Sequence, residues 1–207
     1  MNLLHVISSP RKQRSASIQV ANAFIDAWKI KNPGGSVDLL NVWEIELPPF
    51  DGPALEAKYA GIKGEPLDAD QVAVWKDIQA LAKRFHSAEV IVFSVPMWNF
   101  GIPYRLKHLI DAISQKDVLF TFDEKGLIGM LGDRTVVVIA ARGVKLGPDF
   151  PEEDFDFQSA YLATWSRMVG IRDFHTISVE KTLGGPDEDA ASRAEASIKA
   201  SELAQSL

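Results

Sequence analysis

The sequence predicts an α/β protein whose five-stranded parallel sheet is covered by helices on both faces. Short apolar, β-branched runs alternate along the chain with segments whose apolar residues recur at helical spacing. The runs contain few polar residues, which is typical of strands buried on both sides. A length of 207 residues fits one domain, residues 1–207, with a substantial core.

Each expected element follows from its local pattern. The apolar runs place strands at 3–7, 37–42, 89–95, 135–140 and 174–179. Apolar residues three and four apart place helices that begin near residues 18, 74, 103 and 162. The first helix ends before the breaker cluster Asn32-Pro33-Gly34-Gly35. An Ala- and Glu-rich segment from about residue 187 closes the domain as a fifth helix.

Three segments do not fit this alternation. Residues 43–66 contain four prolines and three glycines, which predicts a long irregular excursion on the surface. Residues 118–122, followed by a turn at Gly126, indicate a small β excursion. Residues 147–157 form a polar loop that ends in an acidic and aromatic run.

The order of the elements predicts where a ligand binds. Five strands favour the flavodoxin-like strand order over the six-stranded dinucleotide-binding fold. Right-handed crossovers then place every carboxyl end at the same edge of the sheet. The loops after strands one, three and four are unusual in composition, so we expect them to converge there on a ligand.

Composition excludes several classes of function. Asp and Glu number 28 against 22 Lys and Arg, a formal charge of −6, which disfavours nonspecific nucleic-acid binding. The chain has no cysteine, and its four histidines lack metal-ligand spacing, so no metal site is expected. The amino terminus does not resemble a signal peptide, and no apolar run is long enough to cross a membrane. We therefore expect a cytoplasmic protein without a membrane partner.

The first loop suits a phosphate. Ser9, Ser15, Ala16 and Ser17 lie between the first strand and the first helix, beside basic residues. A helix amino terminus offers free N–H groups and a positive dipole end, and the serine hydroxyls add donors. Ser15 or Ser17 could instead be a simple helix cap. Because neither a G-x-G-x-x-G motif nor a P-loop is present, the phosphate is expected to be a monoester.

The second loop is the most informative stretch of the chain. Pro96, Met97, Trp98, Asn99 and Phe100 directly follow a strand that is apolar throughout. Thioether, aromatic and amide groups at the end of a central strand suit a flat ligand rich in heteroatoms. Phe100 could equally belong to the core beneath the loop.

The third loop comprises Ala141, Arg142, Gly143 and Val144. Gly143 permits a close approach of the backbone to a ligand or a positive φ angle. The alternatives are that Gly143 is only a turn residue and that Arg142 is an ordinary surface charge. A phosphate site, a flat ring and two backbone-rich loops together describe FMN.

These three motifs resemble the FMN-dependent NADH-azoreductase family, within the NAD(P)H:quinone oxidoreductase group of flavodoxin-like proteins, over nearly the full length. P-M-W-N-F-G-I-P at 96–103 is similar to the family's P-M-Y-N-F-G-I-P, and the S-x5-S-x-S spacing resembles its phosphate loop. A-R-G-V at 141–144 corresponds to S-R-G-G. Trp98 thus replaces a tyrosine, Ala141 a serine and Val144 a glycine, changes that we expect to tune acceptor shape and redox potential.

The resemblance implies the activity. It implies FMN as cofactor, NADH or NADPH as electron donor, and two-electron, ping-pong reduction of quinones and azo compounds without a catalytic side chain. It also implies a homodimer with active sites at the interface, and it places Phe122 and Met168 in the substrate cleft. One alternative is a flavodoxin-type electron carrier without its own organic substrate. The other is a hydrolase, which no nucleophile and base pair in the sequence supports.

Overall fold

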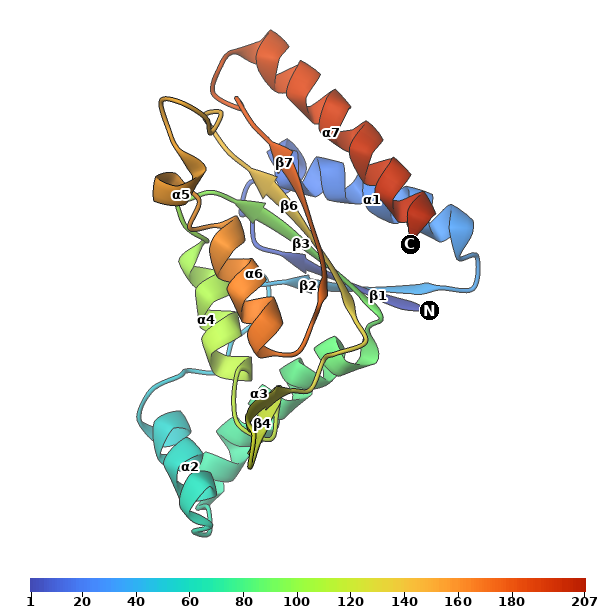
Figure 1. Cartoon of the computed structure of the whole chain (residues 1–207). Helices are drawn as coiled ribbons and strands as arrows, with labels where there is room; N and C mark the ends of the chain where they lie inside the picture. Colours follow the sequence, from blue (N-terminus) through green and yellow to red (C-terminus); the bar gives the residue numbers. More distant parts are fainter.

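A computed structural model describes all 207 residues and contains the expected parallel sheet. Its strand order is β2-β1-β3-β6-β7, with all neighbouring strands parallel (Figure 1). The strands are β1 (Asn2–Ile7), β2 (Ser36–Asn41), β3 (Val90–Pro96), β6 (Thr135–Ala141) and β7 (Asp173–Val179). In order along the chain they are strands 2-1-3-4-5 of the sheet, which confirms the flavodoxin-like prediction.

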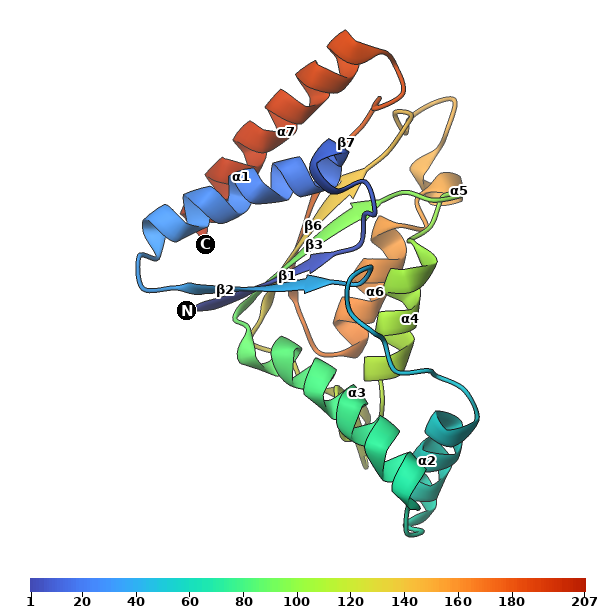
Figure 2. The same ribbon diagram turned by 180° about the vertical axis from the view of Figure 1, so that it is seen from behind.

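Helices cover both faces of the sheet, as predicted. One face carries α1 (Ala16–Lys31) and α7 (Pro186–Ser206), which lie side by side in both views (Figures 1 and 2). The other face carries α3 (Ala69–Ser87), α4 (Tyr104–Ile113) and α6 (Ser159–Met168). The three central strands are consequently almost fully buried, which is why their sequences are apolar throughout.

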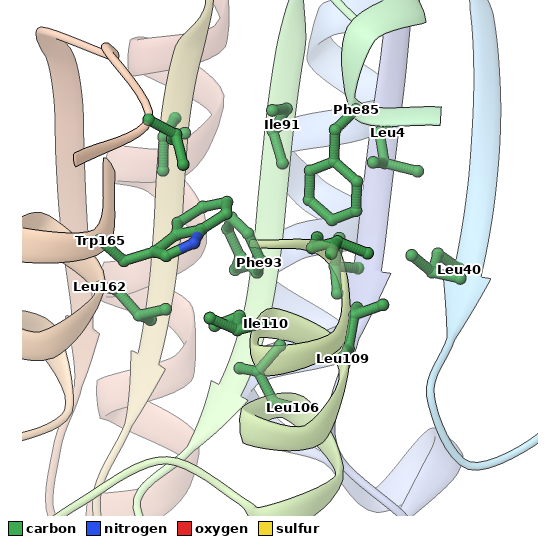
Figure 3. Packing of buried hydrophobic residues seen from close by; sticks show 14 of the residues in the cluster. Leu4, Leu40, Phe85, Ile91, Phe93, Leu106, Leu109, Ile110, Leu162 and Trp165 are labelled. Carbon is green, nitrogen blue, oxygen red and sulfur yellow. The ribbon is translucent and has the colours of Figure 1, made fainter. Parts of the chain in front are cut away.

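The two faces of the sheet are packed by different kinds of side chain. On the α3–α4–α6 face, Phe85, Phe93 and Trp165 meet with ring centroids about 6 Å apart at the centre of the cluster (Figure 3). On the other face, Ala196, Ala200 and Ala204 are the buried residues of α7. Because these side chains are small, α7 packs closely against α1.

The predicted irregular excursion at 43–66 contains a helix, so that prediction was wrong over half its length. Helix α2 (Gly52–Lys63) has proline in its first turn and ends at Gly64, whose φ of 72° caps it. Its buried residues are only Ala54, Ala57 and Ala60, too small to stand out as an apolar face. Stability comes from packing with α3, and the prolines and glycines are the start and stop signals of the helix.

Smaller differences concern the loops. The β excursion is confirmed as a hairpin of β4 (Phe120–Asp123) and β5 (Gly126–Gly129). The polar loop before α6 contains a single helical turn, α5 (Glu152–Phe155), and a 3-10 turn, η1 (Lys12–Arg14), precedes α1. No helix of the chain is both long and apolar enough to span a bilayer.

Candidate flavin site

The three predicted loops meet at the carboxyl edge of the sheet, which confirms their expected convergence. The N–H of Ser8 donates to the carbonyl of Ser94 at 3.1 Å, and the N–H of Met97 donates to the carbonyl of Ala141 at 2.7 Å. The parallel registers of β1, β3 and β6 bring these backbones side by side. In Figure 1 the arrowheads of β3 and β6 point toward α5, away from the β4–β5 hairpin.

The first loop forms a cradle of donors at the start of α1. Ser9, Ser15 and Ser17 are buried, and the hydroxyls of Ser15 and Ser17 lie 3.1 Å apart. Ser15 caps the helix by accepting from the N–H of Ile18 at 3.4 Å, so the capping alternative holds for this residue. The N–H groups of Ala16 and Ser17, like those of any first helical turn, have no intrahelical acceptor. They are free to bind an anion.

The second loop is a tight turn in a strained conformation. Trp98 and Gly101 exchange two backbone hydrogen bonds of 3.0 Å, and the residues between them, Asn99 and Phe100, have φ angles of 48° and 67°. Asparagine adopts the left-handed region readily, whereas phenylalanine does so rarely, and such strain is concentrated at functional sites. The N–H groups of Asn99 and Phe100 have no acceptor within the chain.

The core interpretation of Phe100 was wrong. Its side chain is 39% exposed and packs edge-on against Phe155, with 4.9 Å between ring centroids. Pro96 and Met97 are half-buried, and Trp98 is 37% exposed. The loop therefore presents its aromatic rings at the surface of the site.

Two further aromatic residues support the second loop, and sequence reasoning missed both. Trp43 follows β2, and Tyr104 begins α4; their rings lie 5.8 and 6.3 Å from that of Trp98. The indole N–H of Trp43 also donates to the carbonyl of Ser8 at 2.9 Å, next to the phosphate cradle. Trp43 thereby joins the first loop to the second. The available signal was its place at the end of the second strand, in a segment interpreted only as irregular.

The third loop is fixed by a buried charge. Arg142 is 3% exposed and contacts Asp156 and Glu180, so the interpretation as a surface charge was wrong. A Cβ atom on Gly143 would lie 2.6 Å from Leu183 Cδ1, so glycine permits the close approach of the loop after β7. Ala141 is buried, and Val144 is 38% exposed.

A buried histidine lies beneath the site. His5 of β1 is 1% exposed, and its Nε2 lies 2.5 Å from the hydroxyl of Ser94 on β3. Burial lowers the pKa of His5 to about 4, which keeps the imidazole neutral. The hydroxyl of Ser8 donates to the carbonyl of Ser94 at 2.8 Å, so these residues link the strands under the first two loops.

A cleft extends from the second loop between α4 and α6. Trp98 and Asn99 line a cavity of about 1080 Å³ that also contacts Phe50 and Tyr161. A second cavity of about 420 Å³ shares Phe50 and Tyr161 with it and reaches Met168. Burial and the nearby carboxylate of Asp111 raise the pKa of Tyr161 to about 12.

The two residues predicted for the substrate cleft do not lie beside the three loops of their own chain. Met168 is the last residue of α6, and Phe122 is 56% exposed on β4. The end of α6 and the hairpin both lie toward the amino edge of the sheet, opposite the loops (Figure 1). Within a single chain Met168 lines only the far part of the cleft, and Phe122 lines neither of its two cavities.

The donors present fit FMN. Hydroxyls and first-turn N–H groups suit a phosphate dianion, and unpaired N–H groups beside exposed aromatic rings suit a flat ring with polar edges. Ser9, Ser15 and Ser17 would hold the phosphate, and the second and third loops would hold the ring. The fold and these loops define a flavodoxin-like protein with a flavin mononucleotide site.

Comparison with known proteins agrees with a flavodoxin-like protein that uses FMN. A family model described as flavodoxin-like fold matches residues 1–203. An FMN-dependent NADH:quinone oxidoreductase of Pseudomonas syringae pv. tomato is 53% identical over all of this chain and 99% of its own length. Another from Pseudomonas fluorescens is 43% identical over 99% of this chain and 96% of its own. The chain belongs to the FMN-dependent NADH:quinone oxidoreductase family of flavodoxin-like proteins.

Solved structures share the fold. An FMN-dependent NADH-azoreductase from Bacillus anthracis, in complex with FMN, superposes with a TM-score of 0.85 at 25% identity, over 98% of this chain and 99% of the other. A second azoreductase from the same species has a TM-score of 0.89 at 22% identity over the full length of both chains, a likeness of fold.

Proposed function

We propose that this chain, as one FMN-binding domain over residues 1–207, oxidises NADH and reduces quinones and azo compounds by two-electron, ping-pong transfer. The observation that carries the proposal is the 53% identity, over the full length of this chain, to a relative named as an FMN-dependent NADH:quinone oxidoreductase. The azoreductase resemblance of the second loop and the azoreductase fold support azo compounds as further acceptors.

In this proposal the residues of the chain bind FMN and orient its ring. The serine hydroxyls and the N–H groups of Ala16 and Ser17 would hold the phosphate of FMN. The second and third loops would contact the ring. Their residues are Pro96, Met97, Trp98, Asn99 and Phe100 in the second loop and Ala141, Arg142, Gly143 and Val144 in the third. When bound, FMN supplies the redox chemistry, so no side-chain nucleophile is required. The exposed aromatic rings and the adjoining cavity would give a flat donor and a flat acceptor one shared place, and two ligands that share a place would react in ping-pong order.

A homodimer would complete the cleft. Exposed apolar residues cover one face of α2 and the β4–β5 hairpin, here termed the α2–hairpin surface: Leu55, Tyr59, Ile62, Phe122, Leu127 and Ile128. A second copy related by a two-fold axis would bury this surface and bring its own Phe122 and Met168 toward the three loops of the first. This arrangement accounts for their distance from the loops within one chain.

The alternative of a flavodoxin-type carrier receives less support. The relatives are named as oxidoreductases, and the cavity of about 1080 Å³ beside Trp98 has room for an organic acceptor.

We also propose that the protein works in the cytoplasm, where its proposed donor NADH is found.

The absorption spectrum of the purified protein tests the proposal. We expect visible flavin bands that are bleached by NADH under anaerobic conditions and restored by a small quinone or an azo dye. Bound flavin without consumption of NADH in the presence of a small quinone would favour the carrier. A colourless protein that does not take up added FMN would overturn the assignment.

A further inference from the structure

The guanidinium of Arg142 connects three separate segments of the chain. Its Nε donates to Gln158 Oε1 at 3.2 Å, and one terminal nitrogen donates to the hydroxyl of Ser159 at 2.8 Å and to Asp156 at 2.5 Å. The other terminal nitrogen lies 3.5 Å from Glu180 Oε1. The segment before α6 and the end of β7 are thus attached to the third loop through one side chain that is 2% exposed.

The backbone of Arg142 and Gly143 is also fixed by hydrogen bonds to the loop after β7. The carbonyl of Arg142 accepts from the N–H of Thr182 at 3.1 Å and from its hydroxyl at 3.0 Å. The carbonyl of Gly143 accepts from the N–H of Leu183 at 3.1 Å. Both carbonyls therefore point toward the loop after β7.

This arrangement directs two backbone donors to the opposite side. In a trans peptide the N–H points away from the preceding carbonyl. The N–H groups of Gly143 and Val144 consequently point away from the loop after β7, and neither has an acceptor within the chain. Unpaired, fixed N–H groups at this edge are the donors that the ring of FMN would use.

The same cluster reaches the second loop. Gln158, which accepts from Arg142, donates from Nε2 to the carbonyl of Val95 at 2.9 Å, one residue before Pro96. Asp156 follows Phe155, whose ring packs on that of Phe100. Arg142 is therefore joined by short contacts to both loops that would hold the ring.

We propose that Arg142 is a positioning residue whose buried guanidinium fixes the N–H donors of Gly143 and Val144 and thereby sets the flavin's affinity and reduction potential. The inference rests on the proposed function, and it assigns the arginine side chain no contact with substrate. Fixed donors stabilise negative charge on the reduced ring without reorganisation. Loosening the loop should therefore weaken binding of reduced FMN more than of oxidised FMN.

Arg142→Lys tests the proposal because lysine keeps the charge but lacks the planar fork that reaches both the segment before α6 and Glu180. We expect the FMN dissociation constant to rise about tenfold or more. We also expect the two-electron midpoint potential to fall by about 30 mV, which corresponds to a further tenfold loss of affinity for the reduced cofactor. The matched control is Arg84→Lys: Arg84 donates three hydrogen bonds to Asp38 and Leu39, on β2. The control should leave both quantities unchanged.

The outcomes are separable. Wild type that binds no FMN would refute the proposed function itself. If the wild type binds FMN, and folded Arg142→Lys has the same dissociation constant and the same midpoint potential, the positioning role would be overturned. If Arg142→Lys does not fold, Ser159→Ala and Glu180→Gln each remove or weaken one contact of the fork. These variants should shift the potential downward by a smaller amount, and no shift in either would equally refute the inference.

Discussion

At the scale of single residues, we expect Trp98 to have the largest influence on the choice of acceptor. Its ring is 37% exposed at the head of the cleft and lies against Trp43 and Tyr104. Its backbone is fixed independently by the two hydrogen bonds with Gly101. A change of side chain at this position alters the surface offered to an acceptor without disturbing the turn.

We predict that Trp98→Tyr changes acceptor preference more than FMN retention. The smaller ring removes apolar area from the wall of the cavity, and this loss corresponds to about 1 kcal/mol of binding free energy. We therefore expect a roughly fivefold to tenfold change in the ratio of kcat/KM between a large and a small quinone. The FMN dissociation constant, from fluorescence titration of the apoprotein, should change less than twofold by comparison. A large loss of FMN with an unaltered acceptor ratio would contradict this role.

Ser15 serves both as helix cap and as proposed phosphate ligand, and the two roles can be separated. Ser15→Ala should lower the free energy of unfolding of the apoprotein by about 1 kcal/mol through loss of the cap. It should also weaken FMN binding about tenfold through loss of a donor to a charged phosphate.

Asp68 provides the matched control for Ser15. It caps α3 through a complete capping box with Gln71, remote from the three loops. Asp68→Ala should cost a similar stability in urea unfolding, about 1 kcal/mol, with no effect on FMN affinity. Equal loss of FMN in both variants would show that the effect of Ser15→Ala is only structural.

At the scale of elements, β1 and β3 are joined by a buried polar contact as well as by their ladder. His5 and Ser94 form this contact beneath the first two loops. Because the pKa of His5 is lowered from 6.5 to about 4, the unfolded chain binds a proton before the folded chain does as the pH falls. Folding stability supplied by the neutral imidazole is therefore present above pH 6.5 and lost between pH 6.5 and about 4.

We expect the free energy of unfolding to fall by about 2 kcal/mol more in wild type than in His5→Gln between about pH 7.5 and pH 5. Urea unfolding at the two pH values measures this difference. Carboxylates shared by the two proteins cancel in the comparison. Parallel pH profiles would show that His5 titrates normally.

The alternation of elements and the convergence of three loops could be predicted from sequence because burial on both faces leaves a local mark on a strand. The structure added features whose cause is distant in the chain. Arg142 is buried by partners 14 to 38 residues away, and Gly143 is required by Leu183, none of which is visible in the local pattern. Helix α2 was missed because alanines that pack against another helix resemble a loop in sequence.

At the scale of the whole molecule, the proposed homodimer rests on where the residues proposed for the site lie. The three loops lie at one edge of the sheet, whereas Phe122 and Met168 lie toward the other. The cleft between α4 and α6 runs between them. The α2–hairpin surface is apolar and exposed on an arm that projects from the sheet (Figures 1 and 2). Several large apolar side chains exposed on one arm of a molecule are characteristic of an interface.

The double variant Tyr59→Glu with Ile62→Asp should therefore halve the molar mass measured by light scattering after size exclusion. Charges desolvated within an isologous interface act twice in a dimer, which is enough to separate the subunits at micromolar concentration. Quinone reduction should fall at least tenfold, since each cleft loses the partner's contribution. The control is Ile30→Asp, at an isolated apolar side chain on α1 that is 84% exposed. It should change neither quantity, and a monomeric wild type with full activity would refute the shared site.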